Sequence, residues 1–398
     1  MLVNQMAYIR GDFIHPNRMR DIQMVDLLGQ YEHIKSEIDE AVLNVISSSA
    51  YINGPEVQKF QEELEEFLDV KHVIPCANGT DALQIALMSL GLKPGDEVIT
   101  PNFTFIATAE VIALLNLKPV IIDVHPCTFN MDIQSLKKAI TPNTKAIVPV
   151  HLFGQCADMD QIMEIANEHG IAVVEDTAQA ISSDYTFRDG TKKMAGTMGD
   201  FGTTSFFPSK NLGCFGDGGA LYTNDDALAE KARQIVNHGM KVRYYHEVVG
   251  VNSRLDSIQA AVLRIKLRHL NDYCDKRRAA ADRYDELLSN EPELMVPYRD
   301  PRTTHTFHQY TLRTFGVDRF ALQKHMMDKG IPAMVYYPVP LHKQEAFKKF
   351  GYADKPFPHT DELCEQVISL PMHTELTEEQ IQKITSTLIE FLQKNRKK

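Results

Sequence analysis

The chain has 398 residues, 43% of them hydrophobic and 24% charged, and its formal net charge is −11. This length and composition are typical of a globular protein with two domains and a sizeable buried core. The acidic balance argues against nucleic acid or an anionic membrane as the main partner, because both need a basic face.

The sequence also indicates a compartment. No apolar run reaches the ~18 residues that a membrane span needs. The opening stretch, MLVNQMAYIRGDFIHPNRMR, has no apolar secretory segment. The six cysteines stand singly, without a CxxC pair, which favours reduced thiols over metal ligands or disulfides. We therefore expect a cytoplasmic protein that holds no metal.

The first half of the chain predicts an α/β domain. Residues 1–22 are polar and irregular, and we expect them to be a disordered extension. An amphipathic helix is expected in IKSEIDEAVLNVISS. Between residues 56 and 224 strands alternate with helices, as in TDALQIALMSLGLKPGDEVIT. This alternation predicts βαβ units and a mostly parallel sheet, in which ligands bind beyond the carboxyl ends of the strands.

The second half predicts a smaller domain. A long helix is expected at 253–285, a strand in THTFHQYTLRT, and a helix followed by a strand in FALQKHMMDKGIPAMVYYP. Two amphipathic helices, at 358–369 and 377–394, close the chain. The predicted units are an N-terminal extension (1–22), a large α/β domain (23–255) and a small α+β C-terminal domain (256–398).

Lys210 lies in SFFPSKNLGCFGDGGA, residues 205–220. A lysine in a loop is usually solvated, but the rigid, apolar SFFPS before it would desolvate the amine and lower its pKa. A neutral amine is what a Schiff base with a carbonyl requires. The glycines that follow would let the backbone approach a bulky ligand.

Asp176 ends the apolar strand in VVEDTAQA (173–180). At that position its carboxylate could pair with the protonated ring nitrogen of pyridoxal phosphate, which keeps the ring an electron sink. The alternative is an aspartate that caps the next turn. Glu175 points to the other face, and we interpret it as structural.

Two further stretches could complete a cofactor site. CANGTDAL (76–83) leads into a helix whose free N–H groups and Thr80 hydroxyl suit a phosphate, unless they only cap the helix. Ser205 offers a second hydroxyl, unless it faces solvent. Phe105, in PNFTFIATAE, could stack on a flat ring or simply pack in the core. An amine, a carboxylate, a phosphate site and a stacking ring together fit pyridoxal phosphate, and the chain has no GxGxxG, Walker A or HExxH motif.

The order of these motifs resembles a known family. NGTDAL, PNFTFIATAE, VEDTAQA, GDFGTTSFFPSKNLGCFGDGGALYTND, NHG and GVNSRLDSIQAA follow one another as in nucleotide-sugar aminotransferases of the DegT/DnrJ type, over residues 23–396. The resemblance implies fold type I of the enzymes dependent on pyridoxal 5′-phosphate. It also implies an obligate homodimer with active sites at the subunit interface, and leaves tetramers open.

The resemblance assigns roles residue by residue. Lys210 would bond to the cofactor and then shuttle a proton, while Asp176 would contact the ring nitrogen and Gln179 the ring hydroxyl. In the related sugar dehydratases a histidine stands at position 210, so the lysine indicates amino transfer. The remaining cofactor contacts would come from Gly79, Thr80 and Ser205 at the phosphate, Asn252 of the partner subunit at the phosphate, and Phe105 on the ring.

The implied reaction takes an amino group from L-glutamate, releases 2-oxoglutarate and aminates a keto-sugar nucleotide. The motifs resemble most the branch that aminates C3 of UDP-2-acetamido-2-deoxy-3-oxo-glucuronate for bacterial O-antigen and lipopolysaccharide. Arg243, Tyr337 and His342 are the matching candidates for substrate binding. The chain departs from that branch at Tyr336, where a histidine is expected, and this puts the sugar in doubt. His151 and His238 are interpreted as structural or as lying behind the site.

Three alternatives stay open, one of which is a plain oligomeric scaffold without a cofactor. A C4 aminotransferase of a UDP- or dTDP-4-keto-6-deoxy sugar would carry the same cofactor motifs, since only the segments near 243–246 and 335–343 would differ. A regulatory protein on a non-catalytic copy of the fold would be expected to lack Lys210 or Asp176, or to add a DNA-binding module. Both residues are present.

Overall fold

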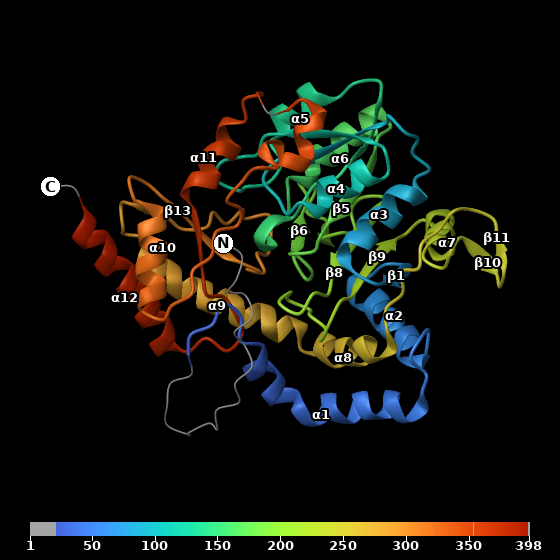
Figure 1. Cartoon of the computed structure of the whole chain (residues 1–398), viewed down its shortest axis with the longest axis horizontal. Coiled ribbons are helices and arrows are strands. Elements are labelled where there is room, and N and C mark those ends of the chain that lie inside the picture. Colours follow the sequence, from blue (N-terminus) through green and yellow to red (C-terminus); the bar gives the residue numbers. More distant parts are fainter. Residues whose placement is uncertain (1–20, 353, 397–398) are drawn as a thin grey trace.

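The structure is a computed structural model that describes residues 21–352 and 354–396 (Figure 1). Of the predicted extension, residues 1–22, the part from 1 to 20 lies outside the described residues. Two helices, α1 (Leu27–Ser48) and α2 (Pro55–Leu68), precede the sheet. The elements of the sheet and its helices then follow as β1 (His72–Cys76), α3 (Gly79–Ser89), β2 (Glu97–Pro101), α4 (Ala107–Leu114), β3 (Lys118–Ile122), α5 (Ile133–Ala139), β4 (Thr144–Ile147), α6 (Met159–His169), β5 (Ala172–Asp176), β8 (Phe201–Ser205), β9 (Gly219–Thr223) and α7 (Asp226–Ile235).

The central sheet has seven strands in the order β1-β9-β8-β5-β4-β2-β3. Only β9 runs against its neighbours, β1 and β8, and the other pairings are parallel. The remaining strands of this sheet therefore point the same way, and their carboxyl ends share one edge. That edge is where open α/β sheets bind ligands. The predicted mixed, mostly parallel sheet is confirmed.

The unit formed by α6 and β5 shows how the sequence builds this layer. The Asp158 side chain caps the start of α6 by accepting a hydrogen bond from the backbone N–H of Gln161. Gly170 ends the helix in the left-handed conformation, at a φ of 63°, which glycine adopts without a steric penalty. The strand AVVED then crosses the core and ends at the buried Asp176. A buried parallel strand of this kind is a near-continuous apolar run.

The second domain is a small antiparallel sheet covered by helices. Its strands are β12 (Leu294–Met295), β13 (Tyr310–Thr314) and β14 (Val367–Leu370), with β13 in the centre. They share one apolar core with α9 (Leu270–Leu288), α10 (Arg319–Asp328) and α12 (Glu378–Asn395). The fully buried rings of Tyr284 and Tyr310, whose centroids are 4.7 Å apart, join α9 to this sheet. Figure 1 shows these helices on one side of the molecule, with α11 (Pro358–Gln366) nearer the large sheet.

The single long helix predicted at 253–285 is two helices. α8 (Ser257–Arg268) ends and α9 begins at His269, whose ψ of −2° departs from helical geometry. α8 packs against α1 and α2, while the second half of α9 enters the core of the small domain. The domain boundary at 255/256 stays a prediction, and packing places α8 with the first domain.

Two strand predictions near the site differ from the structure. The strand expected in the second half of FALQKHMMDKGIPAMVYYP is wrong, since Met334 makes only an isolated bridge to Ser369 before the chain turns away. The strand expected in THTFHQYTLRT begins only at Tyr310. The backbone N–H groups of Thr306 and Gln309 donate instead to the carbonyls of Gly154 and Phe153. In both places contacts with the other domain replace strand pairing.

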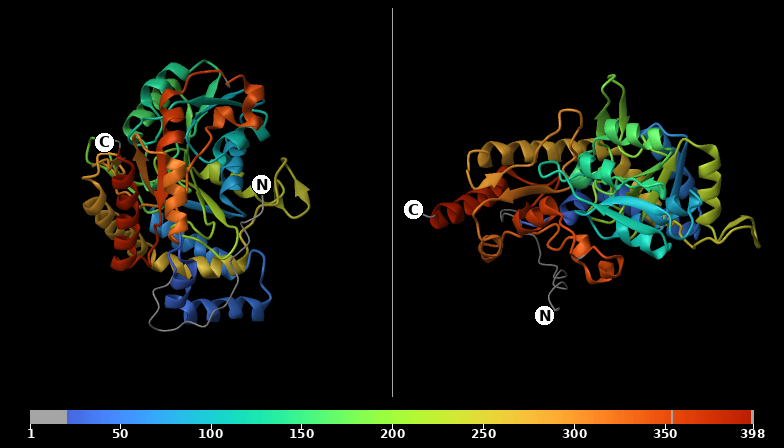
Figure 2. Two further views of the ribbon diagram at one scale, coloured as in Figure 1. Left: turned by 60° about the vertical axis from the view of Figure 1, so that its left-hand side comes forward. Right: turned by 90° about the horizontal axis from the view of Figure 1, so that it is seen from above.

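Two hairpins project from the body of the molecule (Figure 2). One is β6 (Asp184–Thr186) with β7 (Lys192–Met194), and the other is β10 (Met240–Val242) with β11 (Tyr245–His246). Tyr244 and Tyr245 at the tip of the second hairpin are 75% and 70% exposed. None of the described helices is both long and apolar enough to cross a lipid bilayer.

Candidate active site

The predicted cofactor residues gather at one edge of the large sheet. Asp176 ends β5, Ser205 ends β8, and Gly79 follows β1 at the start of α3. The sheet register sets Cys76, Gly219 and Ser205 side by side across β1, β9 and β8. Because these strands are adjacent, the topology itself brings together groups that lie more than a hundred residues apart in the sequence.

Lys210 follows β8 in a tight turn, in which its backbone N–H donates to the carbonyl of Phe207 over 2.8 Å. The side chain is partly buried. Burial lowers the pKa of its amine from 10.5 to about 8, and the nearby carboxylate of Asp176 opposes that change without cancelling it. At this pKa roughly a tenth of the amine is neutral at pH 7 and about half at pH 8, and the lowered pKa agrees with the expectation from the apolar SFFPS stretch.

Asp176 is 6% exposed and its carboxylate is held from both sides. Oδ2 accepts a hydrogen bond of 2.8 Å from Thr108 Oγ1, and Oδ1 accepts one of 3.1 Å from the backbone N–H of Ala178. These contacts fix the carboxylate beside Lys210 and leave it further lone pairs. Sequence reasoning missed Thr108, although a polar residue within the apolar helix ATAEVIAL was a signal.

Gln179 joins two segments that are far apart in the sequence, the one around Phe153 and the one around Tyr337. Its Oε1 accepts a hydrogen bond of 2.8 Å from the backbone N–H of Phe153, and its Nε2 donates to Tyr337 Oη over 3.0 Å. Tyr337 follows a cis peptide bond with Tyr336. Its ring centroid lies 6.4 Å from that of Phe105, which is 54% exposed and presents a ring at the same edge.

At the start of α3, Gly79 packs directly against Ser205. A Cβ built on Gly79 would lie 2.6 Å from Ser205 Cβ, so only glycine fits there. Asn78 caps α3 by accepting a hydrogen bond from the backbone N–H of Asp81, and Thr80 is partly exposed on its first turn. The free N–H groups and the positive end of this helix suit a phosphate, with the Ser205 hydroxyl beside them.

The glycines after Lys210 serve a purpose different from the one that the sequence suggested. A Cβ on Gly219 would lie 2.4 Å from the carbonyl carbon of Asn78, and one on Gly213 would lie 2.3 Å from the carbonyl oxygen of Pro208. The thin backbone thus makes room for the chain itself. The close approach of Gly219 to Asn78 is what seats the start of α3 against Ser205.

Three predicted residues lie apart from this cluster or behind it. Arg243 is exposed on the hairpin of β10 and β11, with its guanidinium 4.9 Å from the centroid of the Tyr244 ring. Asn252 is exposed just after that hairpin and bridges Asn237. His342 is fully buried, with its Nδ1 2.8 Å from Asn102 Nδ2. The roles predicted for them remain predictions.

A fully buried, hydrogen-bonded pair, Glu175 and His151, lies behind the site. Glu175 Oε2 is 2.8 Å from His151 Nε2 and accepts a hydrogen bond from the backbone N–H of Gly196. Oε1 accepts from the backbone N–H groups of Met198 and Gly199, both over 2.7 Å. Because His151 Nδ1 accepts from the backbone N–H of Ala157, Nε2 carries the proton. These contacts fit the structural interpretation of Glu175 and His151.

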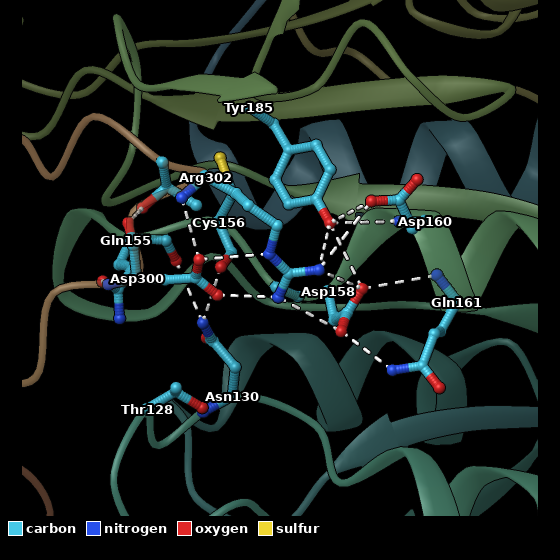
Figure 3. A network of polar contacts seen from close by, with 12 residues as sticks. Thr128, Asn130, Gln155, Cys156, Asp158, Asp160, Gln161, Tyr185, Asp300 and Arg302 are labelled. Atoms are coloured by element: carbon cyan, nitrogen blue, oxygen red, sulfur yellow. Dashed lines mark hydrogen bonds and ion pairs between the residues drawn. The ribbon is translucent and has the colours of Figure 1, made fainter. Parts of the chain in front are cut away.

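A polar network ties the segment 298–303 to the large domain (Figure 3). The guanidinium of Arg302 reaches Asp158 Oδ1 over 3.0 Å and Asp300 Oδ2 over 2.7 Å, and donates to Tyr185 Oη over 3.0 Å. The Asp300 backbone N–H then donates to Gln155 Oε1 over 2.7 Å. Gln155 closes the turn of Leu152–Gly154 whose Phe153 N–H holds Gln179, so the network supports the site from outside.

Comparison with known proteins agrees with this geometry. The DegT/DnrJ/EryC1/StrS aminotransferase family matches residues 32–389. The chain is 46% identical over 93% of its length to a "Pleiotropic regulatory protein" of Geobacillus stearothermophilus, covering 98% of that protein. It is also 46% identical over 92% of its length to the UDP-2-acetamido-2-deoxy-3-oxo-D-glucuronate aminotransferase of Pseudomonas aeruginosa, covering 99% of it.

A solved structure extends the agreement to three dimensions. The crystal structure of DesV from S. venezuelae, in complex with a ketimine intermediate, is 38% identical. It superimposes with a TM-score of 0.90 over 96% of this chain and 100% of that one. The predicted fold, family and enzyme class are confirmed. The chain belongs to the DegT/DnrJ/EryC1/StrS aminotransferase family.

Proposed function

We propose that this sugar aminotransferase moves the amino group of L-glutamate to C3 of UDP-2-acetamido-2-deoxy-3-oxo-glucuronate, with pyridoxal 5′-phosphate as its cofactor. The product would serve bacterial O-antigen and lipopolysaccharide synthesis. The observation that carries the proposal is the amine of Lys210, with its lowered pKa, beside the buried carboxylate of Asp176. A non-catalytic copy of the fold has no need of this pair.

The residues present fit the cofactor. The start of α3 at Gly79 and Thr80, with Ser205 packed against it, would hold its phosphate. Asp176 would pair with the ring nitrogen, and Gln179 would face the ring hydroxyl from its place between Phe153 and Tyr337. The exposed ring of Phe105 would stack on the cofactor. When bound, the cofactor supplies an electron sink for the carbanion formed at the amino-acid Cα.

Lys210 then has two tasks. Its neutral amine would bond to the cofactor's carbonyl carbon with loss of water, and once the donor's amino group displaces it, the freed amine would take the proton from Cα of the donor amino acid. An amine with a pKa of about 8 suits both tasks near neutral pH, because it is neither fully protonated nor too weak a base. The same amine returns a proton in the half-reaction that aminates the sugar.

The proposal includes a homodimer whose sites are shared. Large apolar side chains are exposed along α1, among them Leu28 and Leu43, which are 59% and 60% exposed and line one groove. Beside them α1 and Phe215 line an apolar groove of about 720 Å³. Exposed apolar surface of this kind usually marks an interface. In the dimer Asn252 would reach the phosphate of the partner subunit's cofactor, and the hairpin that carries Arg243 would meet the partner's sugar.

The choice of sugar rests on the Pseudomonas relative and on charge. The proposed nucleotide carries a diphosphate and a carboxylate, for which Arg243 is the proposed cation, and Tyr337 would line the sugar pocket. His342 is buried and would act on the site only indirectly, through its hydrogen bonds to the Asn102 side chain. Tyr336 in place of the expected histidine keeps a C4 aminotransferase of a 4-keto-6-deoxy sugar as the second candidate. The name of the Geobacillus relative favours a regulatory protein as the third.

A sugar panel separates these candidates. The cofactor-loaded enzyme is supplied with L-glutamate and one keto-sugar nucleotide at a time, and the aminated carbon is located by NMR. Amination at C3 of the UDP-3-oxo-glucuronate nucleotide alone supports the proposal. Amination only at C4 of a 4-keto-6-deoxy sugar keeps the enzyme class and overturns the sugar. The regulatory candidate predicts no 2-oxoglutarate from glutamate, and Asp176→Asn should reduce that release by at least about a hundredfold if the proposal holds.

A further inference from the structure

Lys266 is a lysine at a position that calls for an apolar residue. It lies on α8, one helical turn after Leu263, and is only 2% exposed. Leu263 belongs to the apolar core that also holds Leu212, which follows Lys210 closely in the chain. A lysine is almost never fully buried unless a partner compensates its charge. The partner of Lys266 therefore indicates why the chain keeps a lysine there.

That partner is the turn of residues 207–214, called here the Lys210 turn. Lys266 Nζ donates a hydrogen bond of 2.7 Å to the carbonyl of Gly213. Among the described residues Lys266 has no carboxylate within ion-pair distance, and the ring centroid of Phe215 lies 5.1 Å from its Nζ. Burial lowers the pKa of this amine from 10.5 to about 8, and the nearby Cys214 thiol opposes that change. The chain thus buries a charge at a cost, and a single backbone carbonyl receives it.

The Lys210 turn transmits the position of Gly213 to Lys210. The backbone N–H of Lys210 donates to the carbonyl of Phe207 over 2.8 Å. A Cβ on Gly213 would lie 2.3 Å from the carbonyl oxygen of Pro208, so the two arms of the turn touch. Because the arms are in contact, fixing Gly213 also fixes the residues just before Lys210.

A second polar residue of α8 contacts the chain just beyond the turn. Gln259 Oε1 accepts a hydrogen bond from the backbone N–H of Phe215 over 2.8 Å, and its Nε2 donates to the carbonyl of Phe215 over 3.3 Å. Gln259 and Lys266 are two helical turns apart and therefore lie on one face of α8. Only Lys266 bonds within the Lys210 turn, and this difference makes Gln259 a matched comparison.

We propose that Lys266 is a positioning residue for Lys210, which holds the Gly213 carbonyl and thereby fixes the turn that presents the Lys210 amine. This inference rests on the proposed role of Lys210. Lys266 acts only through the backbone of the turn and touches neither cofactor nor substrate. Because a misplacement of about 1 Å can cost about a hundredfold in rate, a turn that is free to shift would slow each step that uses the amine.

The proposal predicts slower capture of the cofactor with no change in the basicity of Lys210. Cofactor-free Lys266→Met, which lacks the donor, should capture pyridoxal 5′-phosphate about tenfold more slowly than wild type. The pH midpoint of capture should stay at the wild-type value, because burial and Asp176 act on the pKa of Lys210 and Lys266 does not. Lys266→Gln has nearly the shape of the methionine variant but keeps an N–H donor, and should capture within about threefold of wild type.

Further measurements separate positioning from stability. Hydrogen exchange of peptides that cover residues 207–214 should be faster in Lys266→Met and near wild type in Lys266→Gln. In the glutamate half-reaction the rate at saturation should fall in Lys266→Met while the KM for glutamate changes little. The matched control Gln259→Met should capture the cofactor within about twofold of wild type, as should Ile384→Val, which only weakens the core of the small domain.

The outcomes distinguish the two claims. Capture by Lys266→Met at the wild-type rate, equal slowing in Lys266→Gln or Gln259→Met, or a shifted pH midpoint each overturns the role of Lys266 while that of Lys210 stands. If Lys210→Ala captures the cofactor as wild type does, the proposed function itself fails. Should Lys266→Met not fold, ¹⁵N NMR of the wild-type lysine amines decides. A Lys266 signal whose protons exchange slowly with water, with and without cofactor, supports the inference, and its absence overturns it.

Discussion

The partly buried amine of Lys210 should destabilise the cofactor-free protein, and Lys210→Met should raise the free energy of unfolding. Burial lowers the pKa of this amine from 10.5 to about 8. At about 1.4 kcal/mol per pH unit, this difference corresponds to at most about 3 kcal/mol, reduced by the part of the side chain that solvent still reaches. Near pH 7 the ammonium is present in both the folded and the unfolded chain, so the full cost applies there.

The sign of the pH dependence follows from the lowered pKa. Between about pH 8 and about pH 10.5 the unfolded chain holds the Lys210 proton more tightly than the folded chain does. The free energy of unfolding of the wild type should therefore rise with pH across this window, relative to Lys210→Met, which does not titrate. The methionine variant should be more stable by up to about 3 kcal/mol near pH 7, and the difference should close at high pH.

Denaturant unfolding of both proteins from about pH 7 to about pH 10 measures this difference. Groups common to the two proteins cancel in the comparison. Lys71→Met, at an exposed lysine, is the control and should give a difference near zero at every pH. A difference for Lys210→Met that stays constant with pH would refute the buried-amine explanation.

Three further predictions concern the scaffold. Gly219→Ala should lose about 1–3 kcal/mol of stability and weaken cofactor binding, because its Cβ meets the Asn78 backbone. Gly216→Ala, which meets only the flexible Gln259 side chain, should change stability by less than about 0.5 kcal/mol, and equal losses in unfolding assays would contradict this. Glu175→Gln should cost about 1–3 kcal/mol, since its amide NH₂ replaces an acceptor oxygen and leaves a buried donor unpaired, and a stability near wild type would show that the carboxylate is dispensable. Burial raises the pKa of Asp158, but the hydrogen bond from Arg302 outweighs burial and lowers it. The resulting stability is lost as pH falls through that lowered value. Arg302→Lys should therefore start acid unfolding at a higher pH, and an unchanged acid transition would contradict the role of Arg302.

Much of the site could be predicted because its residues follow strands. Asp176, Ser205 and Gly79 each come directly after a strand or end one, so the parallel sheet alone brings them to one edge. The lowered pKa of Lys210 followed from the apolar residues beside it. These are local signals, readable without knowing how distant segments pack.

The rest depends on contacts between distant segments. The sequence suggests that the glycines after Lys210 make room for a ligand. Nothing in it indicates that Gly219 instead lies against the Asn78 backbone. THTFHQYTLRT has the composition of a strand, yet its first residues bond to the turn of Leu152–Gly154.

The most direct test of the central claim is to find which lysine bonds to the cofactor. The cofactor-loaded enzyme is treated with borohydride, which fixes a cofactor–lysine bond irreversibly, and the modified peptide is identified by mass spectrometry. The cofactor should be found on Lys210, and glutamate added before the reduction should prevent its fixation. Fixation on another lysine, or none on Lys210, would contradict the account.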